Sequence, residues 1–525
     1  MSPHLDLWHP AGALMVPALI ALAIIIYMKY FYVDFEHIKG LPEVPNGSLV
    51  SGHLYKLGND HASTAQKWAQ THAWPVYQIR LGNRRAIILN SFDAAREFIV
   101  SRQTATCDRP RLYTFHGVVS KTSASTIGMN PWDERTKKQR RVVGSYTTAP
   151  AVKKLQPMLD KETCHVISGL YEDSKKGNEE IMPHIYLKRL ALNIMLMFCY
   201  NRRFVNIDDP LLLNILSDAN TISSFRSTNS NAQDYIPYLR WFNDGKRTAM
   251  ATEVRSRRDK WLAQLLETAD DSVKDGSGKP CVAQGLLVDS EDEKLTKHDI
   301  RTILGGLMSG GFETVFATAI IGTGFLSSPE GQAIQARAYD DLMSNYSSIE
   351  EAFSQVVLEE KSSYIVAFVR ETLRYYPVHH LLPPRQTYQE FEYNGARIPK
   401  GVLVYMNAQS INHDKSKYGP DADEFRPERW LEEKETAVPP PYHFSFGAGA
   451  RMCTAVNFSN KILYATFSRL ILSFKMTASK TMPPSTHYVN YNRDTTAAGA
   501  IPRDFKVLFT PREPEVLESC IRKSQ

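Results

Sequence analysis

The stretch over residues 443–455, HFSFGAGARMCTA, constrains the fold of this chain more than any other segment. Its glycines let the backbone turn tightly and approach a bound group closely. Cys453 stands just before an apolar, helix-like run over 455–474, where the helix dipole and unpaired N–H groups stabilise a thiolate. Arg451 adds a fixed positive charge two residues away. The stretch therefore predicts a loop that presents one thiolate to a flat, electron-poor bound group.

The spacing of four residues in this loop resembles the haem-binding loop of the cytochrome P-450 superfamily, Phe-x-x-Gly-x-Arg-x-Cys-x-Gly. The pattern is met by Phe446, Gly449, Arg451 and Cys453, and Ala455 stands where the family has its last glycine. The resemblance implies an iron protoporphyrin IX haem with Cys453 as axial thiolate ligand, and a propionate partner in Arg451. A lone cysteine beside a glycine turn is more often a buried structural residue, but the spaced Phe, Gly and Arg favour the ligand.

A second motif lies inside a long apolar helix that opens with a capping box, Thr296-x-x-Asp299. The segment 310–314, Gly-Gly-Phe-Glu-Thr, places two glycines mid-helix at a cost of about 1 kcal/mol each relative to alanine. It resembles the oxygen-binding groove of the same superfamily. The resemblance implies that Thr314 holds a proton-delivering water and that Glu313 supplies the proton relay. Close helix packing at the glycines is the alternative explanation.

A third motif is Glu371-x-x-Arg374, which places an acid and a base on one helix face. Alone it is usually a surface ion pair worth 1 kcal/mol or less. The downstream segment 425–430, Phe-Arg-Pro-Glu-Arg-Trp, resembles the superfamily segment whose arginine completes a buried Glu-Arg-Arg network. Arg429 is then the third member, and loss of any one should be severe because a buried charge must be fully paired.

The resemblance also assigns haem and substrate contacts elsewhere. Arg385, after two prolines, and Arg140, on a helix expected from about Trp132, are expected to pair with haem propionates; the family's tryptophan position falls on Thr136, one turn after Trp132. Five residues are expected to line the substrate pocket: Phe312, His379, His380, Thr495 and Thr496. That at least one of the two histidines is purely structural stays open.

The N-terminus carries an apolar run over 11–28, about the length that spans a bilayer, followed by Lys29 and several tyrosines. A cleaved signal peptide needs a positive start, whereas here the first residues carry Asp6 and neither lysine nor arginine. We therefore expect an uncleaved anchor over 1–30, a proline-containing linker over 31–52 and one cytosolic catalytic domain over 53–525. The expected location is the endoplasmic reticulum membrane, crossed once.

The expected fold is mainly α-helical with a small β-rich part, in which residues 76–89 form a hairpin. Helices are also expected over 91–100, 181–200 and 244–267, with a polar surface loop over 270–279. A net charge of +6 in 525 residues is too small to indicate nucleic-acid binding. Six scattered cysteines without a CxxC pair suggest neither a zinc site nor a disulfide framework.

Together the motifs predict a haem-thiolate monooxygenase. Since no flavin or nicotinamide fingerprint is present, the family implies electrons from NADPH through cytochrome P-450 reductase. Segments 127–134 and 500–506 resemble fungal enzymes that hydroxylate small aromatics. This favours m-cresol or 3-hydroxybenzyl alcohol as substrate, in secondary metabolism of the patulin type. Phenylacetate is the nearest alternative, and no positive side chain for its carboxylate is evident among the pocket candidates.

Two other functions stay open. A haem-thiolate isomerase or dehydratase acting on peroxides tends to lack the acid–threonine pair that stands here at Glu313-Thr314. A haem-binding sensor needs neither a proton relay nor a basic surface for a reductase, such as the cluster at Lys137 and Lys138 could provide. Consumption of NADPH with reductase and candidate substrates separates all three functions.

Overall fold

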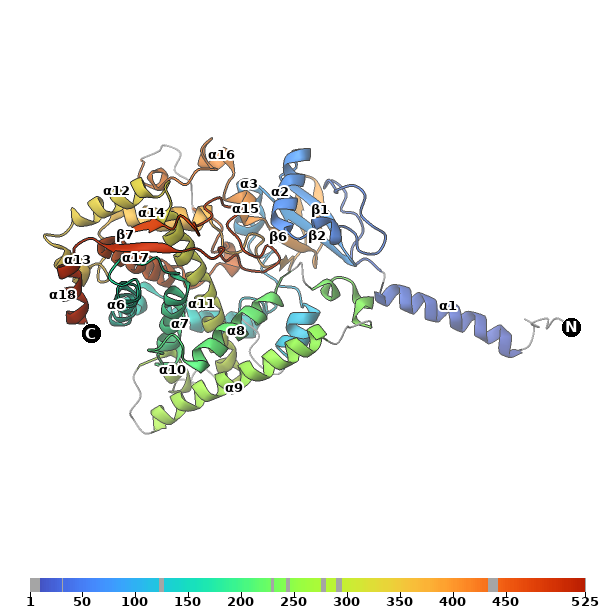
Figure 1. Ribbon diagram of the computed structural model, residues 1–525. Helices are drawn as coiled ribbons and strands as arrows, with labels where there is room; N and C mark the ends of the chain where they lie inside the picture. Colours follow the sequence, from blue (N-terminus) through green and yellow to red (C-terminus); the bar gives the residue numbers. More distant parts are fainter. Residues whose placement is uncertain are drawn as a thin grey trace.

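The computed structural model describes residues 10–30, 32–121, 127–227, 231–241, 246–274, 280–288, 295–432 and 442–524. A large helical body is joined to a smaller β-rich part, and α1 (Pro10–Tyr30) projects away from both (Figure 1). The fold is therefore mainly α with small sheets, as the sequence predicts.

The β-rich part centres on a four-stranded sheet. Its strands, in spatial order, are β1 (Val76–Leu81), β2 (Arg84–Leu89), β6 (Leu403–Met406) and β3 (Arg385–Gln386). The predicted hairpin is present: β1 and β2 pair antiparallel, with the intervening Gly82 at φ 55°. β6 pairs parallel to β2, and β3 closes the edge antiparallel to β6. This pairing brings Arg385 from a distant part of the chain to the sheet edge.

Alternate side chains of the sheet are buried on opposite faces, which follows from the two-residue period of a strand. On β2, Ala86 and Ile88 belong to one apolar cluster, and Ile87 and Leu89 belong to another. Two small two-stranded antiparallel sheets lie outside this sheet: β4 (Phe391–Tyr393) with β5 (Ala396–Ile398), and β7 (Phe474–Ala478) with β8 (Val507–Pro511).

The helical body contains most of the α-helices. They are α4 (Glu134–Tyr146), α5 (Ala149–Lys153), α6 (Gln156–Asp173), α7 (His184–Tyr200), α8 (Pro210–Ser224), α9 (Lys246–Lys274), α10 (Val282–Val288), α11 (Lys297–Ser327), α12 (Gln332–Met343), α13 (Ile349–Gln355), α14 (Ser363–Tyr375), α17 (Val456–Ser473) and α18 (Pro514–Ser524). The remaining α-helices are α2 (His61–His72), α3 (Phe92–Ala95), α15 (Ala408–Ile411) and α16 (Lys415–Tyr418). Short 3₁₀ or π turns are η1 (Tyr55–Leu57), η2 (Arg96–Ser101), η3 (Tyr113–Val119), η4 (Ala232–Asp234), η5 (Pro237–Arg240), η6 (Pro427–Trp430) and η7 (Gly449–Arg451).

Helix α11 runs through the middle of the body (Figure 1). The predicted capping box is present: the Asp299 backbone N–H donates to Thr296 Oγ1 (3.2 Å), and Asp299 Oδ2 accepts from the Thr296 N–H (3.0 Å). By length and composition α11 is the one helix in the described part that could cross a membrane, but 61% of its apolar window is buried inside the protein. It is therefore a core helix. The apolar stretch Met15–Tyr27 of α1 is shorter.

Several predicted element boundaries are wrong by a few residues. The helix expected from Trp132 starts at Glu134, because the side chain of Asp133 accepts the Thr136 N–H (2.7 Å) and caps it. The segment 91–100 is a short helix capped by Ser91 that continues as a π turn. Helix α9 continues to Lys274, past the expected start of a surface loop at 270. The rest of that loop, 275–279, lies outside the described residues.

Candidate active site

The loop before α17 is shaped by two glycines with positive φ, Gly447 (65°) and Gly449 (59°). A Cβ on Gly449 would lie 2.2 Å from the carbonyl oxygen of Ile99, so no other residue fits there. The backbone N–H of Cys453 donates to Phe446 O (2.9 Å). These contacts fix the cysteine at the entry to α17. Burial raises the pKa of the Cys453 thiol, while the Ala455 N–H and the charge of Arg140 oppose that rise.

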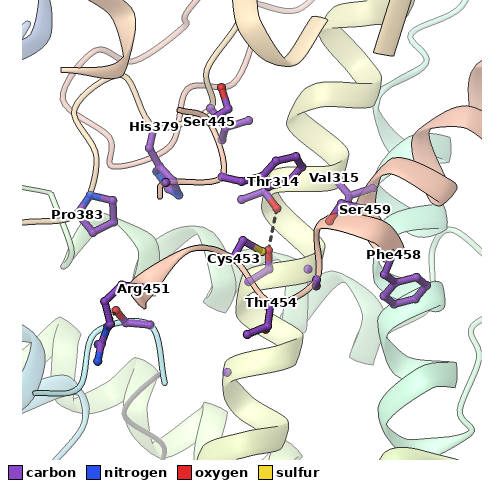
Figure 2. Close-up of a pocket in the computed structure, with 18 of the residues that line it drawn as sticks. Thr314, Val315, His379, Pro383, Ser445, Arg451, Cys453, Thr454, Phe458 and Ser459 are labelled. Carbon is purple, nitrogen blue, oxygen red and sulfur yellow. Dashed lines mark hydrogen bonds between the residues drawn. The ribbon is translucent and has the colours of Figure 1, made fainter. Parts of the chain in front are cut away.

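A cavity of about 280 Å³ lies between this loop and α11, and Cys453 and Thr314 both line it (Figure 2). The Thr314 hydroxyl donates to Gly310 O (2.7 Å). The two helix glycines have different surroundings. A Cβ on Gly310 would meet nothing within 4 Å, whereas one on Gly311 would lie 2.3 Å from the Met195 sulfur. Gly310 thus opens the helix wall toward the cavity, and Gly311 allows close packing against α7.

Four arginines line the same cavity. Each donates at least one hydrogen bond to a backbone carbonyl: Arg109 to Pro384, Arg140 to Met452, Arg385 to Ala448 and Arg451 to Asn130. These contacts place their side chains along one wall but do not use all of their donors. Among the described residues, the buried Nε atoms of Arg109, Arg385 and Arg451, and Nη1 of Arg451, have no hydrogen-bond partner.

The four guanidinium groups are largely buried, and their positive charges repel one another. Burial, together with neighbouring guanidiniums, lowers the pKa of Arg385 to about 9 and that of Arg451 to about 8. Asp108 is the nearby acid that favours the charged form of Arg109 and of Arg451. Unpaired donors and excess positive charge facing a cavity suit a bound group that carries carboxylates.

Arg109 was not predicted from the sequence. In the sequence Arg109 is an arginine before a proline in an irregular stretch, and this pattern is too common to indicate a cavity residue. Trp132, in contrast, lies under the guanidinium of Arg451, whose Cζ is 5.2 Å from the centre of the indole ring. Arg140, Arg385 and Arg451, each expected to pair with a haem propionate, thus line the same cavity, and Arg109 lines it with them.

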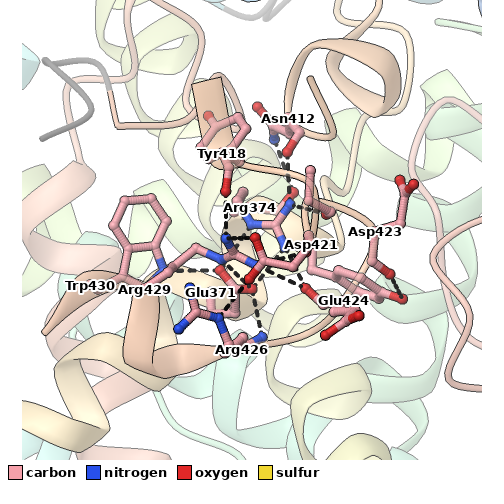
Figure 3. A network of polar contacts seen from close by, with 12 residues as sticks. Glu371, Arg374, Asn412, Tyr418, Asp421, Asp423, Glu424, Arg426, Arg429 and Trp430 are labelled. Atoms are coloured by element: carbon pink, nitrogen blue, oxygen red, sulfur yellow. Dashed lines mark hydrogen bonds and ion pairs between the residues drawn. The ribbon is translucent and has the colours of Figure 1, made fainter. Parts of the chain in front are cut away.

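The Glu371 carboxylate is the centre of a buried polar network (Figure 3). Arg374 donates to both of its oxygens (2.7 and 2.9 Å), and Arg429 Nε donates to Oε1 (3.1 Å). The Arg426 backbone N–H (2.8 Å) and Trp430 Nε1 (2.9 Å) add two further donors. Burial alone would raise the pKa of Glu371, but the charges and hydrogen bonds of Arg374 and Arg429 outweigh it and lower the pKa. The three residues predicted to interact therefore do so.

A second cavity, of about 230 Å³, adjoins the first and shares Gly310, Val378 and Leu382 with it. Both cavities are lined by His379, and the second also by His380 and Thr495. Both histidines are bonded: His379 Nδ1 to Ala498 O (2.7 Å) and His380 Nε2 to the Tyr491 hydroxyl (3.2 Å). Burial lowers the pKa of both, that of His380 to about 4, so they are neutral at pH 7.

Three predicted residues lie elsewhere. Thr496 donates to Asp494 Oδ1 (2.6 Å) and is not among the residues that line the described cavities. Phe312 and Glu313 line a third, small cavity of about 50 Å³. They face away from the first cavity because successive side chains on α11 point in different directions around the helix. Burial raises the pKa of Glu313, while the charge of Arg226 opposes that rise.

Comparison with known proteins agrees with this geometry. The family model "Cytochrome P-450" matches residues 42–491. The chain is 38% identical over 511 residues to phenylacetate 2-hydroxylase of Emericella nidulans, covering 96% of this chain and 97% of that protein. It is 32% identical over 504 residues to 3-hydroxyphenylacetate 6-hydroxylase of the same organism, covering 96% and 95%. A solved zebrafish cytochrome P-450 structure with abiraterone matches with a TM-score of 0.68 at 19% identity, covering 86% of this chain and all of that one, which supports the fold.

The fold and the thiolate loop define a haem-thiolate protein. The chain belongs to the cytochrome P-450 family, whose cofactor is a cysteine-ligated haem, and it is a monooxygenase. The residues of the first cavity fit that cofactor. The open wall at Gly310 leaves room for a flat ring, and the unpaired donors of Arg109, Arg385 and Arg451 suit its two propionates.

Proposed function

We propose that this monooxygenase hydroxylates a small aromatic substrate held in the second cavity, with Cys453 as the axial haem ligand. The observation that supports it best is the pair of adjoining cavities. The first is lined by Cys453 and Thr314, and the second is small and mixes apolar walls with a few polar groups. At about 230 Å³ it is below the range of roughly 300–1,000 Å³ that is usual for drug-sized ligands. Such a space suits one aromatic ring with a short substituent.

When bound, the haem supplies the oxygen chemistry, and thiolate ligation favours O–O cleavage. The residues of the chain supply position and protons. Arg109, Arg140, Arg385 and Arg451 would hold the propionates. The Thr314 hydroxyl, which now donates to Gly310 O, has lone pairs that can accept a hydrogen bond from a water in the first cavity. Glu313, which was expected to feed the relay, lines the third cavity and not the first, so it has no direct contact with that water.

Two classes of substrate suit the second cavity. The first is an arylacetic acid, the class named for the two relatives from Emericella nidulans. The second is an uncharged phenol such as m-cresol or 3-hydroxybenzyl alcohol, in patulin-type secondary metabolism. The preference for phenols depended on the lack of a positive side chain among the expected pocket residues. Arg109 and Arg226 both line the second cavity, which removes that reason.

The electron donor we propose is NADPH–cytochrome P-450 reductase, because the sequence carries no flavin or nicotinamide fingerprint of its own. The proposed location is the endoplasmic reticulum membrane, with residues 1–30 as anchor, 31–52 as linker and 53–525 as cytosolic catalytic domain. Support comes from α1, whose apolar side chains such as Leu19 and Ile25 are each 58% exposed. The acid–threonine pair Glu313-Thr314 argues against an isomerase or dehydratase.

The test is turnover by purified enzyme with reductase and NADPH. Phenylacetate, m-cresol and 3-hydroxybenzyl alcohol are compared with toluene, a steroid and a long fatty acid. Oxygen- and NADPH-dependent hydroxylation of at least one small aromatic acid or phenol supports the proposal. Turnover of the steroid or fatty acid alone, or NADPH-independent rearrangement of a peroxide, would overturn it.

A further inference from the structure

Arg226 follows α8 and lines both the second and the third cavity. No sequence motif predicted a role for it. Its guanidinium lies over the ring of Phe115, with Cζ 5.5 Å from the ring centre. Its Nε atom is buried and has no hydrogen-bond partner among the described residues. A buried guanidinium with an unused donor at a cavity wall is costly to keep unless it binds something.

The charges around Arg226 come from several elements. Glu313 on α11 favours its charged form, Arg258 on α9 opposes it, and burial lowers its pKa. Glu313 lines the third cavity and not the second. Asp60 is the acid that lines the second cavity. Its Oδ1 accepts a hydrogen bond from the Ser63 N–H (2.9 Å) and so caps α2.

The other charged or titratable groups of the second cavity do not replace Arg226. His61, His379 and His380 are buried with lowered pKa values, so they are neutral at pH 7. The charge of Asp60 acts on His380, whereas that of Arg226 acts on His379. The acid and the arginine therefore neighbour different histidines. Arg109 belongs to the arginine cluster of the first cavity and donates to Pro384 O (2.7 Å).

We propose that Arg226 binds the carboxylate of an aromatic acid in the second cavity, so that the substrate class is arylacetic acids. A planar guanidinium can donate two parallel hydrogen bonds to a carboxylate, which fixes orientation as well as position. Gly310, Val378 and Leu382, which line both cavities, offer an apolar surface for the ring between Arg226 and Thr314. This inference rests on the proposed function and specifies its substrate.

The test measures binding and not turnover, because Arg226 also neighbours Glu313. Equilibrium dialysis of the haem-loaded enzyme without NADPH compares phenylacetate with phenylacetamide, which has nearly the same shape and no charge. Wild type should bind the acid more tightly. Arg226→Gln should weaken phenylacetate binding by about 10- to 100-fold, the range for a hydrogen bond to a charged group. Phenylacetamide binding should change by less than threefold, and Arg226→Lys should recover part of the loss.

The matched control is Arg255→Gln on α9. Arg255 Nη1 donates to Val118 O (2.9 Å), and the residue is not in the wall of the second cavity, so both affinities should stay as in wild type. If wild type does not prefer the acid, or if Arg226→Gln weakens acid and amide equally, the inference is overturned, although aromatic hydroxylation stands. If no small aromatic binds or is hydroxylated, both this inference and the proposed function fail. If Arg226→Gln does not fold, the inference is still tested by the preference of wild type for phenylacetate over phenylacetamide and by the affinities of Arg226→Lys.

Discussion

At the scale of single residues, the site depends on how little freedom the cysteine loop has. Gly449 is packed against the Ile99 carbonyl, and the Cys453 N–H is bonded to Phe446 O. Burial raises the pKa of this thiol, so a bound metal must stabilise its thiolate. Of the other cysteines, four are buried and Cys281 is half-buried.

We expect Cys453→Ser to abolish the thiolate-ligated haem spectrum, because a serine hydroxyl does not ionise to replace a thiolate at neutral pH. The measurement is the reduced, CO-bound difference spectrum, together with haem content. Cys281→Ser is the matched control, since its side chain is also partly exposed, and it should keep the wild-type band. A wild-type Soret band in Cys453→Ser would contradict the assignment.

Thr314 is the second residue whose role can be isolated. We expect Thr314→Ala to lower product formation by about 100-fold, the lower end of what a positioned proton donor contributes. NADPH consumption should fall much less, with the difference appearing as peroxide. Thr323→Ala is the control, because Thr323 makes the same bond to the carbonyl four residues earlier (2.8 Å) but lies in the core. Equal coupling in wild type and Thr314→Ala would remove Thr314 from the mechanism.

Much of the site could be predicted from the sequence where spacing carries the chemistry. Cys453, Thr314 and three of the cavity arginines belong to motifs with fixed offsets. Arg109 and Arg226 could not be found that way, because each sits in irregular backbone and reaches the cavity only through long-range packing. Phe312 is only two residues before Thr314 but lines the third cavity, since two residues along a helix turn the side chain by about 200°.

At the scale of elements, α14 and η6 are joined through one carboxylate. Glu371 on α14 receives donors from its own helix and from Arg426, Arg429 and Trp430. The sequence predicted Arg429 as partner but not the backbone N–H of Arg426 or the indole. Caps were predicted better than ends: the Thr296–Asp299 box starts α11 as expected, whereas α9, expected to end at 267, continues to Lys274.

We expect Glu371→Gln to lower the free energy of unfolding by about 3–5 kcal/mol, the range for a buried ion pair that loses one partner. The amide keeps the shape but leaves the charges of Arg374 and Arg429 buried without a counter-charge. Thermal unfolding and haem retention are the measurements. Glu390→Gln, opposite the largely exposed Arg397, is the matched control and should leave the unfolding midpoint unchanged. Equal midpoints for both variants would show that the network does not hold the fold together.

At the scale of the whole molecule, two apolar helices have opposite surroundings. Most of the apolar window of α11 is buried by the body, while α1 projects from it with exposed apolar side chains (Figure 1). Exposed apolar surface of that extent marks an interaction site. α1 meets the body near η5, where Trp241 follows with 55% of its surface exposed. Trp241 thus adds an exposed apolar side chain to the surface beside α1.

We expect deletion of residues 1–30 to release the protein from membranes without loss of haem, because α1 ends at Tyr30 and the haem cavity is lined by residues from Arg109 onward. The measurement is sedimentation of membranes after a salt wash, with the thiolate-haem spectrum of the soluble fraction. In the full chain, Ile20→Lys with Ile24→Lys should weaken membrane retention, since each charge near the middle of a spanning helix costs about 3 kcal/mol. A deletion variant that still sediments would require a second contact, and Trp241→Ser in that variant would test the surface beside η5. If the deletion variant is soluble and binds haem, α1 alone accounts for the attachment.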